Sequence, residues 1–78
     1  MINYSTRLRN GNLALATQNA GLFILDKEGN VLNHLDKSSG LQDLTINFIF
    51  EDDQGGLWLA MNNGIARVEL SSPFSVID

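Results

Sequence analysis

Three consecutive acidic residues form the densest group of titratable side chains in the sequence. Glu51, Asp52 and Asp53 stand directly before a glycine-containing turn signal at 54–56. Carboxylates in such a row can bind calcium or act as an acid and base pair. No complementary His, Lys or further carboxylate cluster accompanies them, and the residue spacing of a calcium loop is missing. We therefore predict a solvated hairpin tip in which one Asp caps the turn, and no metal site.

The other candidates for chemistry are the single histidine and two serine pairs. His34 could serve as a phosphoacceptor or general base, but it lies in a predicted outer strand without kinase-type surroundings. Ser38-Ser39 and Ser71-Ser72 lack a partnered base and do not resemble a nucleophile elbow. We expect an ordinary exposed histidine and turn serines. No catalytic residue is predicted, and this segment is not expected to be an enzyme.

The composition describes a small folded chain without covalent staples. Its 78 residues are 44% hydrophobic and 18% charged, with no cysteine and one histidine, which excludes disulfides and cysteine-rich zinc sites. The net charge is −4, and six of the nine acids lie in residues 40–78 beside a single base, Arg67. Without a basic face, neither nucleic acid nor an anionic membrane is an expected partner, and no cofactor is predicted.

The sequence contains an internal repeat. Residues 2–19 align with residues 46–63 at an offset of 44, with seven identities in eighteen positions. After the next turn the offset falls to 43, where Gly21 aligns with Gly64 and Leu25 with Val68. The unit is therefore 43–44 residues long and occurs twice. A period in the forties fits four-stranded propeller blades as well as helical repeats.

Local signals favour strands over helices. Turn signals cut each copy into short segments, so no typical helix fits between them. The intervening segments are rich in Ile, Leu, Val and Phe. They predict eight strands, four in each copy, at 2–9, 12–18, 21–26, 31–36, 46–52, 57–61, 64–70 and 73–77.

Several of these strands are apolar at consecutive positions, for example 22–25, 48–50 and 57–61. An antiparallel sheet with one wet face should alternate, so both faces of each sheet must be covered. A β-propeller covers both, because each blade packs face to face on its neighbours. We predict an all-β chain of two four-stranded antiparallel β-propeller blades, a fragment of a larger propeller. Residues 1–39 form the first, degenerate blade and residues 40–78 the second.

The second copy resembles the regulator-propeller repeat of bacterial two-component sensors. The shared pattern is a Gly-Leu entry at 40–41, Glu-Asp at 51–52, Leu-Trp at 57–58 and Asn-Gly-Ile at 63–65. The first copy departs from it. Arg7-Leu8-Arg9 stands where the second copy has three acids, and Ala14 stands where it has Trp58.

The resemblance implies an extracytoplasmic, periplasmic location in a membrane-anchored receptor, often a hybrid histidine kinase. The implied function is sensing and signal transduction: ligand binding shifts the arrangement of paired receptors, and connector domains pass the change to a cytoplasmic kinase. The segment itself is non-catalytic. Two other classes remain open, namely an enzymatic propeller of the lyase or sialidase kind with catalytic residues on other blades, and a propeller that binds proteins.

Four residues carry the expected blade motif. Asp53, Gly55 and Trp58 form a hairpin in which Gly accepts a positive φ, an Asp bonds turn amides and the indole wedges between blades. Gly64 belongs to the next turn. The Asp-x-Gly-x-x-Trp order also resembles the Asp-box turn of sialidase propellers, where it is structural.

The loops at one rim are the candidate ligand surface. Gln18, Asn19, Asn62, Asn63 and the segment 37–45 should emerge together, and amide side chains suit sugar hydroxyls. The alternative is that these asparagines only tolerate a left-handed turn conformation. Expected partners are the remaining blades, or further copies of the chain closing a ring of three or four or exchanging strands, and a carbohydrate or other small ligand.

Overall fold

The computed structural model describes residues 2–70 and the backbone of residues 75–77. Each of the eight predicted strands is present, with its ends within two residues of the expected positions. A short 3₁₀ turn, η1, was not predicted. The predicted serine pair Ser71-Ser72 lies outside the described residues. The elements are β1 (Ile2–Arg7), β2 (Leu13–Thr17), β3 (Leu22–Leu25), β4 (Val31–Leu35), η1 (Lys37–Ser39), β5 (Ile46–Glu51), β6 (Gly56–Met61), β7 (Gly64–Glu69) and β8 (Ser75–Ile77).

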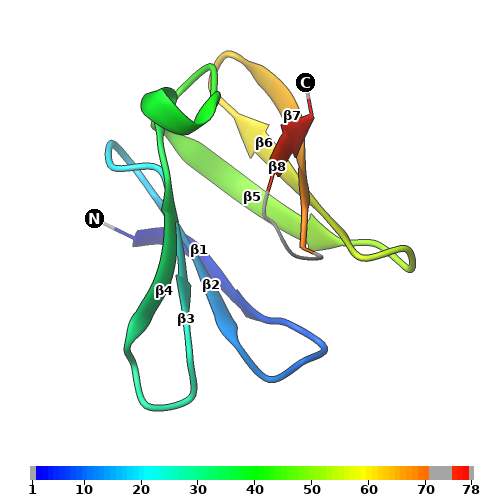
Figure 1. Cartoon of the computed structure of the whole chain (residues 1–78). Coiled ribbons are helices and arrows are strands. Elements are labelled where there is room, and N and C mark those ends of the chain that lie inside the picture. Colours follow the sequence, from blue (N-terminus) through cyan, green and yellow to red (C-terminus); the bar gives the residue numbers. More distant parts are fainter. Residues whose placement is uncertain (1, 71–74, 78) are drawn as a thin grey trace.

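The strands form two antiparallel four-stranded sheets. Their orders are β1-β2-β3-β4 and β5-β6-β7-β8, so every strand pairs with the next one along the chain. Figure 1 shows the two sheets inclined to each other, with the green segment that contains η1 connecting them at one end. Asp36 caps η1 by accepting a hydrogen bond from the Ser38 amide, and Gly40 ends it with φ 106°. The all-β prediction is confirmed.

The sequence repeat is also a repeat of strand register. In the first sheet Tyr4 pairs with Ala16, and in the second Phe48 pairs with Ala60. Both ladders shift register at one point, between Ile2 and Tyr4 and between Ile46 and Phe48. The residue inside each shift is an asparagine, Asn3 or Asn47, and these two align in the sequence repeat.

Each sheet has two faces, which strand pairing defines. We call one the front face; it comprises Tyr4, Thr6, Ala14, Ala16, Leu22 and Ile24 in the first sheet and Phe48, Phe50, Trp58, Ala60, Ile65 and Arg67 in the second. The opposite, back face comprises Ile2, Ser5, Leu13, Leu15, Phe23 and Leu25 in the first sheet and Ile46, Ile49, Leu57, Leu59, Ala66 and Val68 in the second. The members of each pair of sets align one by one in the repeat.

The core lies between unlike faces. The front face of the first sheet and the back face of the second contribute most members of one buried cluster. Ala14 and Ala16 of β2 are small and fully buried, which lets the first sheet approach β5 of the second sheet closely. The two sheets therefore stack front to back, in the same sense, and each outer face of the pair is left uncovered by the other sheet.

Candidate functional site

Asp52 is the centre of the polar contacts at the β5–β6 turn. One carboxylate oxygen accepts hydrogen bonds from the amides of Gln54 and Gly56, each at 2.8 Å. The other accepts from Trp58 Nε1 at 3.0 Å and from Arg67 Nε at 3.2 Å. A carboxylate with four donors around it has its acceptor capacity filled.

These bonds hold Asp52 ionised. The backbone amides of Gly56 and Gln54, followed by Arg67 and Trp58, lower the pKa of the Asp52 carboxyl to about 2. Such a group is neither a proton donor nor an effective base at neutral pH. Asp52 thus ties the turn to strands β6 and β7, and its environment suits a structural role better than acid–base chemistry.

Arg67 extends the network across the front face of the second sheet. Its Nη1 donates to Glu69 Oε2 at 2.8 Å, and its guanidinium carbon lies 6.0 Å from the centre of the Trp58 ring. The guanidinium occupies the space that a side chain on Gly56 would fill. Hydrogen bonds from Arg67 to Glu69 and Asp52 raise the pKa of Arg67 above its ordinary value.

The carboxylate that caps the turn is therefore Asp52, one residue before the Asp53 named from the sequence. The side chain of Asp53 is 94% exposed and forms one ion pair, 2.8 Å from Arg9 Nη2. Glu51 accepts a hydrogen bond from the Arg9 amide at 3.0 Å. The two outer acids of the triplet thus join the hairpin tips of the two sheets, and the middle one caps the turn.

The other blade-motif residues are two glycines and Trp58. Gly55 has φ 80° and Gly64 has φ 131°, both in the region that favours glycine. Trp58 was expected to wedge between blades. It lies on the front face of the second sheet, which the first sheet leaves uncovered, and it is 41% exposed. Its place between two blades stays a prediction, because the first sheet packs against the opposite face.

The candidate rim loops do come together at one end of the sheets. The Gly21 amide donates to the Leu44 carbonyl at 2.9 Å, and the Thr45 hydroxyl donates to the Gln18 carbonyl. The Asn62 amide donates to the Thr45 carbonyl at 3.2 Å. The linker residues 44–45 therefore bond to the β2–β3 turn and to the β6–β7 turn.

Three of the four rim amide side chains form no hydrogen bond with the described residues. Gln18, Asn19 and Asn63 are exposed, and their side chains bond to none of the described residues. No described residue other than glycine has a positive φ, so left-handed turn geometry does not account for these asparagines. That interpretation from the sequence is wrong, because glycines such as Gly21, with φ 85°, occupy those positions.

Asn62 belongs instead to a chain of amides that sequence reasoning missed. Asn3 Nδ2 donates to the Ile46 carbonyl at 3.3 Å and lies 3.4 Å from Asn47 Oδ1, and Asn47 Nδ2 donates to Asn62 Oδ1 at 2.8 Å. The alignment of Asn3 with Asn47 was the available signal. These amides link the register shifts of the two sheets along β1 and β5.

His34 lies at the rim end of the first sheet, beside the β2–β3 turn. Its Nε2 bonds to the Ala20 carbonyl, so that nitrogen carries the proton. The ring stacks on Phe23, with centroids 4.1 Å apart and planes 7° from parallel. These contacts hold the β2–β3 turn against β4, which is a structural role.

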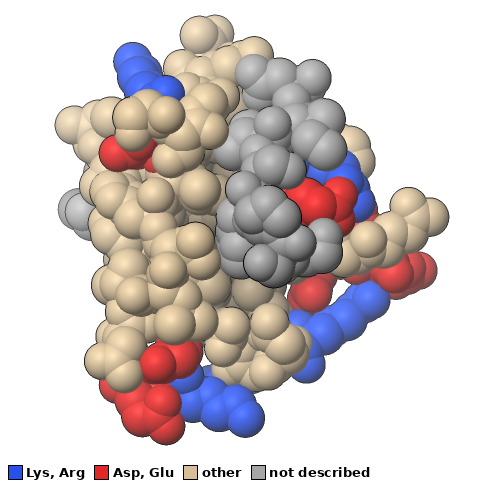
Figure 2. Space-filling model, in the orientation of Figure 1, with Lys and Arg blue, Asp and Glu red and all other residues tan. Residues whose placement is uncertain are grey.

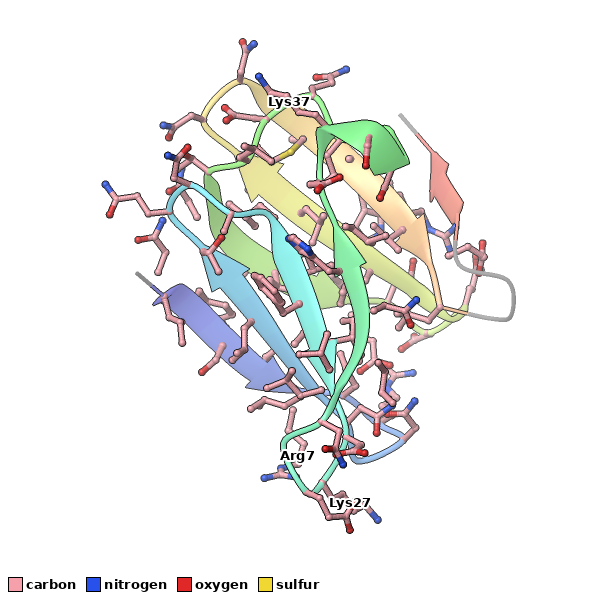
Figure 3. The ribbon with its side chains drawn as sticks, turned by 60° about the vertical axis from the view of Figure 1, so that its left-hand side comes forward. Arg7, Lys27 and Lys37 are labelled. Carbon is pink, nitrogen blue, oxygen red and sulfur yellow. The ribbon has the colours of Figure 1, made fainter. Side chains whose placement is uncertain are left out.

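Charged groups lie mainly at the edges of the molecule. In Figure 2 the Lys, Arg, Asp and Glu side chains form groups at the upper left, at the lower left and on the right, and a broad uncharged area on the left separates the upper group from the lower one. Figure 3 places Arg7 and Lys27 at the end of the sheets opposite Lys37. Among the described residues there is no enclosed pocket and no group of three or more potential metal ligands.

No helix in residues 2–70 or 75–77 is long and apolar enough to cross a membrane. Comparisons of the chain with protein-family models, with curated proteins and with solved structures find no match.

Proposed function

We propose that the chain is a two-blade segment of a β-propeller that serves as the non-catalytic, ligand-sensing part of a two-component sensor. The observation that carries the propeller is the repeated sheet, with the same asparagine at the same register shift, stacked front to back on its neighbour. A contact between unlike faces can be repeated indefinitely, and it closes into a ring when the rotation per unit allows. Four-stranded antiparallel sheets that pack face to face around a ring make up a β-propeller, and the stacking of these two sheets supports that proposal.

The sensor function rests on the resemblance of residues 40–65 to regulator-propeller repeats and on the character of the rim. Gln18, Asn19 and Asn63 offer paired donors and acceptors to a ligand, and sugar hydroxyls suit them. Because residues 44–45 bond to both turns, a ligand at the rim would restrain two sheets and their linker together. We place this segment in the periplasmic part of a membrane-anchored receptor, whose connector domains carry the signal to a kinase.

The enzymatic alternatives place their catalytic residues on other blades, and we propose no acid or base within this chain. A lyase or sialidase needs a titratable group free to exchange protons or attack. Asp52 is saturated with hydrogen bonds, and the His34 Nε2 is occupied by a carbonyl.

The first test is the gene on either side of the segment. The proposal expects further blades of the same repeat, an immunoglobulin-like connector, one membrane span and a histidine kinase. A complete gene without a span and without signalling domains would overturn the sensor function.

The second test is ligand binding by the parent receptor region. We expect calorimetric titration with an oligosaccharide panel to find a ligand whose affinity falls about tenfold in Asn19→Ala or Asn63→Ala, the loss expected for one or two hydrogen bonds. Gln54→Ala is the matched control, because Gln54 is an exposed amide at the hairpin tip, away from the rim. An equal loss in the control would contradict the rim site.

A further inference from the structure

The front face of the second sheet is an exposed apolar surface. Phe48, Phe50, Trp58 and Ile65 are 47%, 56%, 41% and 64% exposed. They come from three adjacent strands, and pairing places Phe50 opposite Trp58 and Ala60 opposite Ile65. Contiguous apolar side chains on one face mark a surface that another molecule covers.

The first sheet shows what covers such a face. Ala14 and Leu22 are the repeat equivalents of Trp58 and Ile65, and both are fully buried against the second sheet. Tyr4 is partly buried, and its ring contacts that of Phe48, with centroids 5.0 Å apart. A front face in this protein is therefore covered by the back face of a repeat unit.

The back face of the first sheet is the matching uncovered surface. Leu13 and Leu15 are only partly buried, whereas their identical equivalents Leu57 and Leu59 are fully buried. Ile2 is 55% exposed, and its equivalent Ile46 is fully buried. The apolar residues of this back face are thus suited to an interface, and no part of the described chain covers them as the first sheet covers their equivalents.

Charge at the hairpin tips favours a second copy as the occupant. At the existing contact the basic tip of the first sheet meets the acidic tip of the second, through Arg9 with Glu51 and Asp53. If the same stacking continues onto another copy, the acidic tip at Asp53 meets the basic tip at Arg7 and Arg9 of that copy. Basic and acidic tips then alternate, and each contact joins opposite charges.

We propose that the front face of the second sheet docks onto the back face of the first sheet of a second copy, head to tail, so that copies close a ring. The inference rests on the propeller part of the proposed function. Rings of about 4–8 blades would need roughly two to four copies. The Asn47 amide would then meet Asn3 of the next copy, as Asn3 meets Asn47 within one chain.

Light scattering on a size-exclusion column tests the proposal. We expect the wild-type chain at micromolar concentration to elute at a multiple of 8.6 kDa. Ile65→Asp places a charge on the front face of the second sheet, and Leu15→Asp places one on the back face of the first sheet. Each variant alone should therefore be monomeric. An equimolar mixture should form a 1:1 dimer, because the intact front face of the Leu15→Asp variant can dock onto the intact back face of the Ile65→Asp variant. Lys37→Asp, in the exposed turn η1 between the sheets and on neither of the two faces, is the control that should assemble like the wild type.

Circular dichroism checks that each variant is folded, and Ile2→Asp replaces Leu15→Asp if the latter unfolds. A monomeric wild type overturns the inference, as does a mixture that stays monomeric. Assembly of either variant alone also overturns it, since that would mean a contact between like faces. None of these results tests the sensor function, because in a longer polypeptide the neighbouring blades would cover the same faces. The domains encoded on either side of the segment test that function.

Discussion

At the scale of single residues, Asp52 joins a turn amide pair, an indole and a guanidinium. We expect Asp52→Asn to lower the melting temperature clearly, because an amide cannot accept all four bonds, and because Arg67 would lose one of its two carboxylate partners and keep only Glu69. Asp53→Asn is the matched control, since its ion pair with Arg9 lies at the surface, where such pairs contribute little. Thermal unfolding followed by circular dichroism measures both; equal losses would argue against the assigned role of Asp52.

The lowered pKa of Asp52 predicts how stability depends on pH. Its folded pKa of about 2 lies below the ordinary value of 3.8, so folding favours the ionised form. The contribution is complete above the ordinary value and is lost as pH falls from about 4 toward about 2. Hydrogen bonds from Asn30 and Ser38 also lower the pKa of Asp26 and Asp36.

Urea unfolding at a series of pH values checks this prediction. The loss of stability between pH 4 and pH 2 should be smaller in Asp52→Asn than in the wild type, with a remainder from Asp26 and Asp36. Parallel pH curves for the two proteins would rule out Asp52 as a source of the acid sensitivity.

The sequence predicts an Asp-capped turn but not which Asp makes the cap. Asp52 and Asp53 differ only in their place relative to the end of β5, and strand register decides that place. The rim was predictable as a group of turns from the repeat. The alignment of Asn3 with Asn47 was visible in the repeat, but their hydrogen bonds to each other and to Asn62 were not predictable, because these depend on two register shifts that no local pattern indicates.

At the scale of the elements, the β2–β3 turn of the first sheet requires glycine at position 21. Gly21 has φ 85°, and a side chain there would collide with the Leu35 carbonyl of β4. Gly29 has φ 90° with open space around it, so it isolates the cost of backbone conformation. We expect Gly29→Ala to cost about 1–2 kcal/mol of unfolding free energy and Gly21→Ala clearly more.

Urea denaturation of the two variants tests the comparison. Equal losses would mean that the approach of β4 to Gly21 contributes nothing. Both variants should keep an all-β circular dichroism spectrum, because the strands themselves are unchanged.

Strand positions were predictable because apolar runs and turn residues alternate along the chain at short intervals. The turn η1 was not, because its cap uses Asp36 and Ser38 in a linker without a periodic pattern. The consecutive apolar residues in β6 correctly indicated two apolar faces. They could not indicate which face of the second sheet the first sheet would cover.

At the scale of the whole molecule, the two sheets place identical residues in unlike surroundings. Leu59 is fully buried between the sheets, whereas its equivalent Leu15 is only partly buried. Leu59→Ala should cost about 2–5 kcal/mol of unfolding free energy at any protein concentration. Leu15→Ala should cost less in dilute solution and more once copies assemble through the back face.

Chemical denaturation at low and high protein concentration distinguishes the two positions. A Leu15→Ala cost that does not change with concentration would contradict assembly through the back face. Leu59→Ala serves as the internal control in both series.

The pairing of each strand with its successor has a consequence for synthesis. The first sheet uses only residues 2–35, so all its strand pairs can form before the second sheet exists. Its front face then stays uncovered until β5, β6 and β7 have been synthesised, which takes a few seconds at the usual translation rate of about 5–20 residues per second. During that interval Leu22 and Ile24 are open to water, and nascent chains on one message are most vulnerable to sticking together. Codons that speed translation between β4 and β7 would shorten the exposure and raise the yield of folded protein.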